Sequence, residues 1–174
     1  MEYLQIPKLI KNDAFYDERG VFVPLSLTSH VTWLQSNISV NIKPFTLRGL
    51  HFQKEPYQQS KLIKVIDGSI IDFITDLNPK SEEFLKIKMF TMDPGNELYV
   101  PQNYAHGFIT LKENTIVQYL VNNIYHPESE GVIPWTKFSE LNEKFNSIDN
   151  FSSEKIIVKE RDLVLKNFDP INFA

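Results

Sequence analysis

The chain has 174 residues, 42% of them hydrophobic and 23% charged, so residues 1–174 fit one globular domain with a sizeable core. A net charge of −4 does not favour binding to nucleic acid or to an anionic membrane surface. The segment before Asn12 lacks the apolar run of a signal peptide or membrane span. The chain contains no cysteine, which excludes disulfides and thiolate metal sites and fits a reducing, cytoplasmic environment.

The first part of the chain contains short extended segments separated by turns. Leu4–Ile10 predicts a short strand, which Pro7 confines to the edge of a sheet. The other elements predicted here are a turn at Asp17–Gly20, an extended segment at Val21–Val23, a helix or loop at Thr28–Gln35 and a strand at Ser36–Val40.

The middle of the chain has the clearest strand pattern. Residues 61–66 alternate between two faces, and the dipeptide Asp67-Gly68 that follows is typical of tight hairpin turns. We therefore predict a hairpin whose returning strand covers residues 69–77. That strand is mostly apolar, which indicates burial on both faces. Asp72 inside it is expected to hold a structural hydrogen bond.

The second half continues with short strands and little helix. The strand at His106–Leu111 is expected to pair with Thr115–Val121 across the turn Lys112–Asn114. The other predictions are strands at Leu85–Met89, Leu98–Val100 and Ile156–Val158 and a helical turn at Ser139–Phe145. Many short strands separated by glycine and proline predict an all-β sandwich or barrel with short C-terminal helical turns. A jelly-roll arrangement of these strands leaves a ligand cavity between the sheets.

The most distinctive stretch is RGLHFQ at residues 48–53, which combines a cation, an imidazole and an amide. In an extended segment His51 and Gln53 lie on one face, with Arg48 nearby, so all three can point into a pocket. Taken alone, the stretch fits an ordinary strand edge equally well, with a surface arginine and a half-buried histidine.

Two kinds of chemistry suit a histidine in such a fold. A metal site needs three or four ligands, and Gln53 stands where a second histidine would follow His51. The alternative, which we favour, is metal-free proton transfer. It uses a neutral imidazole as base, a tyrosine as acid and a cation to hold an enolate oxygen. The candidates for these roles on predicted strands are His51, Tyr119, Lys61 and Arg48.

Several motifs follow one another along most of the chain: DERGVF at 17–22, LRGLHFQ at 47–53, KLIKVIDG at 61–68, LYVP at 98–101, AHGF at 105–108 and YHPESE at 125–130, with Trp135 closing the last. Together and in this order they resemble the dTDP-4-dehydrorhamnose 3,5-epimerase family. The resemblance implies a jelly roll of the cupin type, usually a homodimer. It also implies a nucleotide-linked 4-keto-6-deoxy sugar as substrate and no metal or other cofactor.

The resemblance also implies roles for individual residues. His51 matches the general base, Tyr119 the general acid and Lys61 the lysine near the keto oxygen. Asp162 matches the carboxylate that pairs with the base. The predicted substrate or nucleotide contacts are Arg48, His106, Arg19, Gln35 and Asn37, together with Gln53 from its place beside His51.

The sequence departs from the family pattern in places. Ile38 stands where the family often has histidine, and Ser60 stands where a glycine often precedes the lysine. These departures leave open the nucleotide, dTDP or GDP, and the sugar. The expected function is therefore an epimerase that inverts carbon 3, carbon 5 or both, in the supply of sugars for lipopolysaccharide or capsule.

Four alternatives stay open beside this function. Three are enzymes: a carbon-3-only epimerase, an epimerase of GDP-linked 4-keto-heptoses, and a keto-isomerase on the same scaffold. The fourth is a non-catalytic jelly roll that only binds sugar nucleotides. The joint presence of His51, Lys61, Tyr119 and Asp162 argues against this last one.

Overall fold

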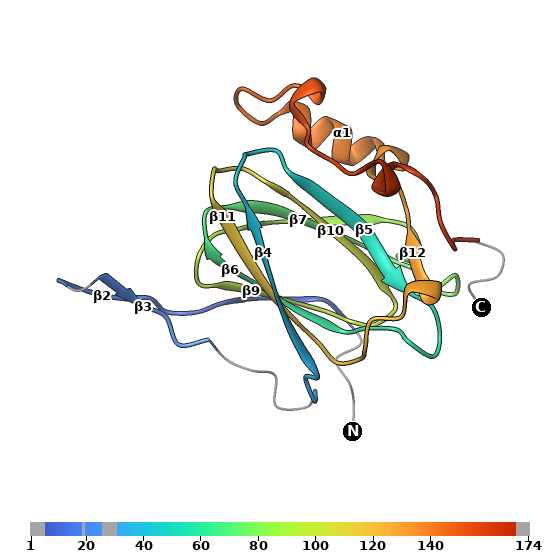
Figure 1. Ribbon diagram of the computed structural model, residues 1–174, viewed down its shortest axis with the longest axis horizontal. Helices are drawn as coiled ribbons and strands as arrows, with labels where there is room; N and C mark the ends of the chain where they lie inside the picture. Colours follow the sequence, from blue (N-terminus) through green and yellow to red (C-terminus); the bar gives the residue numbers. More distant parts are fainter. Residues whose placement is uncertain (1–5, 19, 26–30, 170–174) are drawn as a thin grey trace.

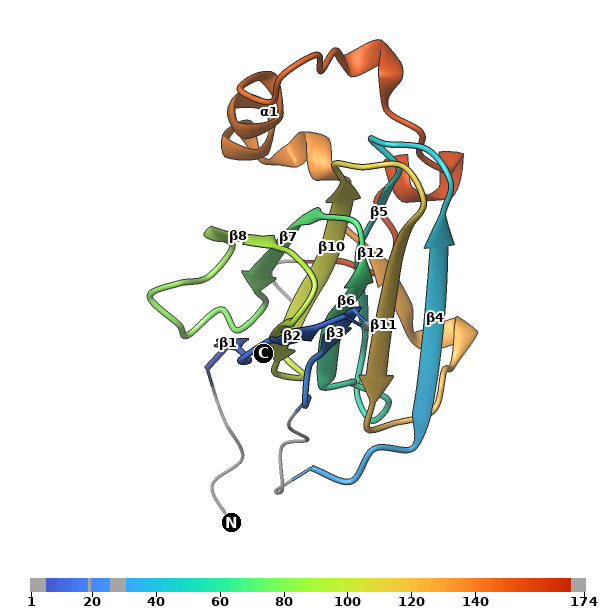
Figure 2. The same cartoon turned by 90° about the vertical axis from the view of Figure 1, so that its left-hand side faces the viewer.

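The computed structural model describes residues 6–18, 20–25 and 31–169. Within this part of the chain, two five-stranded antiparallel sheets face each other (Figure 1, and from the side in Figure 2). The first sheet has the order β1 (Lys8–Lys11), β9 (Asn96–Val100), β6 (Lys61–Asp67), β11 (Thr115–Val121) and β4 (Gln35–Asn41). The second has the order β12 (Glu130–Val132), β5 (Leu47–Gln53), β10 (Tyr104–Thr110), β7 (Ile70–Asp76) and β8 (Ile87–Met92). The predicted all-β jelly roll is confirmed.

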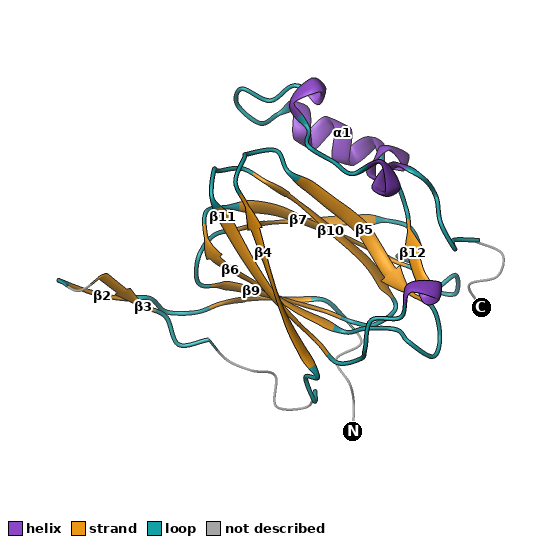
Figure 3. Cartoon of the chain, in the orientation of Figure 1, coloured by secondary structure: helices purple, strands orange, loops and turns teal. Residues whose placement is uncertain are grey.

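The remaining elements lie outside the two sheets. A ribbon of β2 (Phe15–Asp17) and β3 (Gly20–Phe22) projects from the body of the molecule (Figure 1). In the part of the chain that the structure describes, helical structure is confined to the C-terminal part, as Figure 3 shows. It comprises the helix α1 (Ser139–Asn146) and the 3-10 turns η1 (Pro127–Ser129), η2 (Trp135–Lys137), η3 (Ser153–Lys155) and η4 (Glu160–Leu163). No helix among the described residues is long and apolar enough to cross a membrane.

Two apolar cores account for the burial of the second sheet on both faces. One core fills the space between the sheets and includes Ile70 and Ile74 of β7. The other lies on the opposite face of the same sheet, where Phe73 packs with Phe145 of α1. Because β7 contacts both cores, all seven of its residues are buried, as its apolar sequence predicts.

The two predicted hairpins are wrong. The strands on either side of Asp67-Gly68 belong to different sheets: β6 pairs with β9 and β11, whereas β7 pairs with β10 and β8. Likewise β10 and β11, on either side of Lys112–Asn114, lie in opposite sheets. A turn dipeptide specifies only a tight change of direction. Here both turns carry the chain across the sandwich, because each strand buries its apolar side chains against the facing layer.

Smaller differences concern the ends of the chain. In the described part of the strand predicted at Leu4–Ile10, β1 begins after Pro7 and forms an edge of the first sheet, as expected, while Leu4 and Gln5 lie outside the described residues. Residues 31–34 form a loop, while the rest of the helix or loop predicted before Gln35 lies outside the described residues. Ile156–Val158 is not a strand. Its only pairing in the described chain is one parallel bridge from Ile157 to Thr46.

Candidate active site

Two glycines bring β5 and β10 unusually close. Side chains of these two strands form the floor of a cavity. A Cβ atom at Gly49 would lie 2.6 Å from Gly107 Cα, and one at Gly107 would lie 2.7 Å from Arg48 O. Gly49 also has φ +109°, which other residues rarely adopt. The register between the strands shifts beside Gly107, and His106 faces His51 across the pair. The glycines of the two motifs therefore place two imidazoles side by side.

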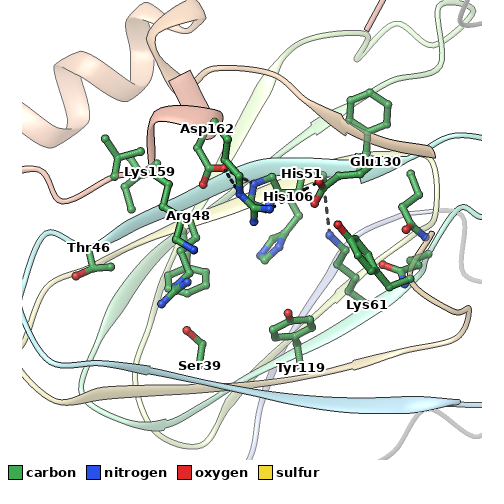
Figure 4. Close-up of a pocket in the computed structure, with 18 of the residues that line it drawn as sticks. Ser39, Thr46, Arg48, His51, Lys61, His106, Tyr119, Glu130, Lys159 and Asp162 are labelled. Carbon is green, nitrogen blue, oxygen red and sulfur yellow. Dashed lines mark hydrogen bonds and ion pairs between the residues drawn. The ribbon is translucent and has the colours of Figure 1, made fainter. Parts of the chain in front are cut away.

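A cavity of about 660 Å³ opens above this floor. Its lining comes from both sheets and from the chain after α1, with Arg48, His51 and His106 on the second sheet and Lys61 and Tyr119 on the first. Figure 4 shows Tyr119 on the wall opposite His51, with Lys61 between them at one side. A substrate held in this space is reached from two faces.

His51 is paired with a carboxylate. Its Nε2 lies 2.9 Å from Asp162 Oδ1, and Asp162 Oδ2 accepts a hydrogen bond from the Gly49 backbone N–H at 3.3 Å. Burial acts to raise the pKa of Asp162, but the hydrogen bond and charge of His51 and the Gly49 N–H hold it below its ordinary value. An ionised Asp162 accepts the proton of Nε2 and leaves the Nδ1 lone pair of His51 free to act as a base.

Lys61 reaches the cavity from β6, on the facing sheet. Its Nζ donates a hydrogen bond to the backbone oxygen of His51 at 3.3 Å. Burial lowers the pKa of Lys61 to about 8, while the charges of Asp72 and Glu130 act in the opposite direction. At neutral pH the ammonium group is therefore charged, and it can stabilise an oxygen that gains negative charge.

Tyr119 and Arg48 also line the cavity. Burial raises the pKa of Tyr119, and the positive charge of Arg48 only partly offsets this, so the phenol stays protonated. The Nε of Arg48 donates to Asn41 Oδ1 at 2.9 Å, and Asn41 Nδ2 donates in turn to Thr115 O at 3.1 Å. This anchoring through Nε leaves the outer nitrogens of the guanidinium group to the cavity.

The other predicted contact residues fall into three groups. Gln53 lines the cavity. It also holds the backbone at Tyr57 and His126 in place, because its Nε2 donates to Tyr57 O at 2.6 Å and its Oε1 accepts from His126 N at 2.7 Å. Gln35 and Asn37 lie on the edge strand β4, bonded to each other at 2.6 Å, and do not line the cavity. Arg19 lies outside the described residues.

The sequence reasoning missed several cavity residues. Tyr125 and Glu130 lie in the YHPESE motif, but no role was assigned to them. Burial raises the pKa of Tyr125, as do the charge of Glu130 and its hydrogen bond. Lys159 and Arg161 also line the cavity, and only their closeness to Asp162 in sequence could have indicated this. Among the described residues, no three His, Asp or Glu side chains gather as metal ligands would.

A jelly roll with acidic, basic and cationic groups on facing walls of one cavity defines the class of protein: an acid–base enzyme that moves protons on a bound substrate. The family model described as dTDP-4-dehydrorhamnose 3,5-epimerase matches residues 4–169. The chain belongs to this family, which is a family of isomerases.

Individual relatives agree with the family model. A dTDP-4-dehydrorhamnose 3,5-epimerase of Escherichia coli is 32% identical over 173 residues, which cover 94% of this chain and 90% of the relative. The solved structure of the Bacillus anthracis enzyme with TDP and PPi bound is 32% identical, with a TM-score of 0.78 and coverage of 91% and 92%. The Legionella pneumophila enzyme in complex with dTDP-4-keto-L-rhamnose is 28% identical, with a TM-score of 0.74 and coverage of 91% and 86%.

Proposed function

We propose that the chain epimerises carbons 3 and 5 of a dTDP-linked 4-keto-6-deoxy sugar, without a metal or other cofactor. The observation that carries this proposal is the placement of a carboxylate-paired imidazole, His51, and a protonated phenol, Tyr119, on opposite walls of one cavity. Inversion at a carbon requires that one proton leave on one face and another arrive on the other face. A single wall could only return the proton to the face it left.

The keto group at carbon 4 makes the protons on carbons 3 and 5 acidic. The Nδ1 of His51 removes one of these protons, and the electrons move onto the keto oxygen as an enolate, which the ammonium of Lys61 stabilises. The imidazolium that forms is held by ionised Asp162. Tyr119 then donates its phenolic proton to the opposite face of the ring, and the keto group forms again. The phenolate regains a proton from solvent, and the imidazolium of His51 releases one to solvent.

The nucleotide is expected to lie toward the cationic rim of the cavity. Arg48, Lys159 and Arg161 line it, and the guanidinium and ammonium groups suit a diphosphate. The names of the relatives and the TDP bound in the Bacillus anthracis structure favour dTDP over GDP. We place this activity in the cytoplasm, in the supply of a sugar for lipopolysaccharide or capsule, since activated sugars for such polymers are made inside the cell.

The exposed apolar residues support a homodimer. Phe15, Tyr16 and Phe22 on the β2–β3 ribbon are 59%, 80% and 68% exposed, and Ile38 and Val40 on the edge strand β4 are 68% and 57% exposed. A projecting ribbon and an unpaired strand edge are suited to packing against a second copy.

The deciding experiment follows solvent deuterium into the sugar by NMR. The enzyme is incubated in deuterated water with the dTDP-linked and the GDP-linked 4-keto-6-deoxy sugar in separate samples. We expect deuterium at carbons 3 and 5 and inversion at both, with the dTDP compound preferred. Deuterium at carbon 3 alone would identify a carbon-3 epimerase, and migration of the keto group would identify a keto-isomerase. Binding without any exchange would overturn the proposal.

A further inference from the structure

A second imidazole–carboxylate pair lies beneath the floor of the cavity. His106 Nε2 is 2.7 Å from Asp72 Oδ2, and Asp72 belongs to β7, the strand beside β10. The predicted hydrogen bond of Asp72 is confirmed. Asp72 is 0% exposed and does not line the cavity, whereas His106 does. Asp72 can therefore act on a substrate only through its neighbours.

The second oxygen of this carboxylate is the unusual feature. Asp72 Oδ1 is buried and has no hydrogen-bond partner among the described residues. A buried carboxylate is normally compensated, because an isolated charge away from water is costly. The two basic side chains that act on Asp72 are His106 and Lys61. Lys61 is itself buried, and among the described residues its Nζ donates one hydrogen bond, to His51 O at 3.3 Å.

Charge balance then fixes the protonation of the three groups. A buried cluster favours zero net charge, and an ionised Asp72 beside a neutral His106 balances the charge of Lys61, with Glu130 as a second carboxylate acting on Lys61. An ionised carboxylate only accepts hydrogen bonds, so the proton of His106 must lie on Nε2. The distance of 2.7 Å between Nε2 and Oδ2 is typical of a hydrogen bond to a charged acceptor. The Nδ1 of His106 is then unprotonated.

We propose that Asp72 is a positioning residue with two effects: it serves as the counter-ion of Lys61, and it fixes His106 with an Nδ1 lone pair presented to the cavity. The group of the substrate that meets Nδ1 is then a donor, which on a sugar ring is a hydroxyl. His106 thereby selects sugars that carry a hydroxyl at that position. This inference rests on the proposed function for its substrate, but its protonation states belong to the ligand-free protein.

The surroundings support this assignment. Burial lowers the pKa of His106, against the charge and hydrogen bond of Asp72, so the imidazole is a weak base that accepts a hydrogen bond rather than a proton. Burial raises the pKa of Asp72, and His106 and Lys61 act against that rise. The other titratable groups that act on Lys61 and His106 are Glu130 on β12 and His51 on β5.

The first test is ¹⁵N NMR of the histidine side chains in the ligand-free wild-type protein. We expect Nε2 of His106 to carry a proton and Nδ1 to carry none between about pH 6 and 8. The His106 signals are assigned by their loss in His106→Gln. A protonated Nδ1 in this range overturns the inference, whatever substrate the enzyme uses.

The second test measures the effect of Asp72 on Lys61. In Asp72→Asn the counter-ion is lost, so the alkaline fall in kcat/KM should move from about pH 8 to lower pH. The matched control is Asp76→Asn, a buried carboxylate on the same strand that bonds Tyr104 and Asn103 instead. We expect Asp76→Asn to keep the wild-type profile even if it lowers the melting temperature.

The outcomes of the second test separate a positioning role from a purely structural one. An Asp72→Asn enzyme that loses activity equally at every pH, with the alkaline fall unmoved, contradicts the inference. If Asp72→Asn does not fold, the NMR result on the wild type decides. Failure of the proposed function is recognised separately, since the wild type would then exchange no deuterium into any 4-keto nucleotide sugar.

Discussion

At the scale of single residues, the chemistry depends on which proton each group holds. Asp162 lies 2.9 Å from the Nε2 of His51, and Asp72 lies 2.7 Å from the Nε2 of His106. Both rings have a carboxylate partner, but His51 is partly exposed to the cavity, whereas His106 is buried, and this burial lowers the pKa of His106. The same pairing can thus make one imidazole a base and the other a hydrogen-bond acceptor.

The base is tested by removing it. In His51→Asn, exchange of solvent deuterium should fall by roughly two to four orders of magnitude at both carbons, because no other group replaces the general base. Asp162→Asn should lose less, since the imidazole remains and only its orientation and charge support are lost. Exchange rates come from NMR, and circular dichroism confirms that the variants fold. A folded His51→Asn with wild-type exchange would exclude His51 as the base.

The acid is tested by separating exchange from inversion. In Tyr119→Phe, His51 and Lys61 still form the enolate, and the imidazolium can return a proton to the original face. Deuterium exchange should persist while net inversion falls much further, with little change in packing volume. Tyr104→Phe is the matched control, because its hydroxyl bonds Asp76 in the core. Equal losses of exchange and inversion in Tyr119→Phe would remove it as the donor.

The pH dependence follows from Lys61. Its pKa of about 8 means that the cation is lost above this pH, so kcat/KM should fall there, well before the raised pKa of Tyr119 is reached. In Lys61→Arg the side chain stays charged at higher pH, so this fall in kcat/KM should move to higher pH. The overall rate should be lower, because a guanidinium group does not reproduce the geometry of an ammonium group. A fall that stays near pH 8 in Lys61→Arg would belong to another group.

Lys61 also contributes to the pH dependence of stability. Its pKa in the folded state lies below the ordinary value of 10.5, so the unfolded chain binds more protons between about pH 8 and that value. The contribution of Lys61 to folding stability therefore rises with pH across this window. Below about pH 8 the buried ammonium of Lys61 destabilises the folded state by an amount that does not change with pH.

Much of the site was predictable from the sequence, chiefly through motifs. The RGLHFQ and AHGF motifs identify His51 and His106, and the structure brings Lys61, Tyr119 and Asp162 to the same cavity. Their roles stay predictions. The tautomers and the second carboxylate pair depend on distances across three strands, and strand periodicity carries no such information.

At the scale of elements, the C-terminal strap, residues 157–168, is what delivers Asp162 to His51. It joins the second sheet through the bridge from Ile157 to Thr46 at one end and that from Lys166 to Val132 at the other. Near its end, Asn167 Nδ2 donates to Glu130 O at 2.8 Å and Glu128 O at 3.2 Å. Asn167 has φ +54°, a conformation that asparagine tolerates better than most residues.

Loss of this anchor should reduce activity without unfolding the protein. Each of the two hydrogen bonds contributes about 0.5–1.5 kcal/mol, so Asn167→Gly should release the strap locally and lower kcat/KM by up to roughly a hundredfold. Asn167→Ala should lose more, because alanine adds the strain of positive φ. The melting temperature should change little, since Asn167 itself is exposed and both substitutions leave the apolar contacts of the strap in place. Unchanged kcat/KM in both variants would show that the strap holds without Asn167.

The elements themselves were predicted better than their connections. Most strand positions follow from local alternation and turn residues, and the helix at Ser139–Asn146 lies where a helical turn was expected. The two hairpins failed because strand pairing is decided by distant partners. β6, for example, pairs with residues of β9 and β11, and no signal within Lys61–Ser69 identifies these partners.

At the scale of the whole molecule, the proposed homodimer is tested by sedimentation. The wild type should be a dimer at micromolar concentration. Val40→Lys should shift it toward monomer, because a charge replaces an apolar side chain on the edge of β4. Gln102→Lys adds the same charge at an exposed turn outside the proposed interface and should leave the dimer intact. A fully active wild-type monomer would contradict the proposal.

The unequal covering of the two sheets has a consequence for heating. The sheet that carries both imidazoles is packed on both faces, whereas Tyr119 lies on β11, beside the exposed strand β4. Local opening starts where packing is thinnest, so in the separated protomer backbone amides of β4 and β11 should lose their protection before those of β5 and β10. Warming the enzyme below its melting point would then disturb the donor wall first. The enzyme would continue to remove protons from the sugar ring but would lose control over the face of the ring to which a proton returns.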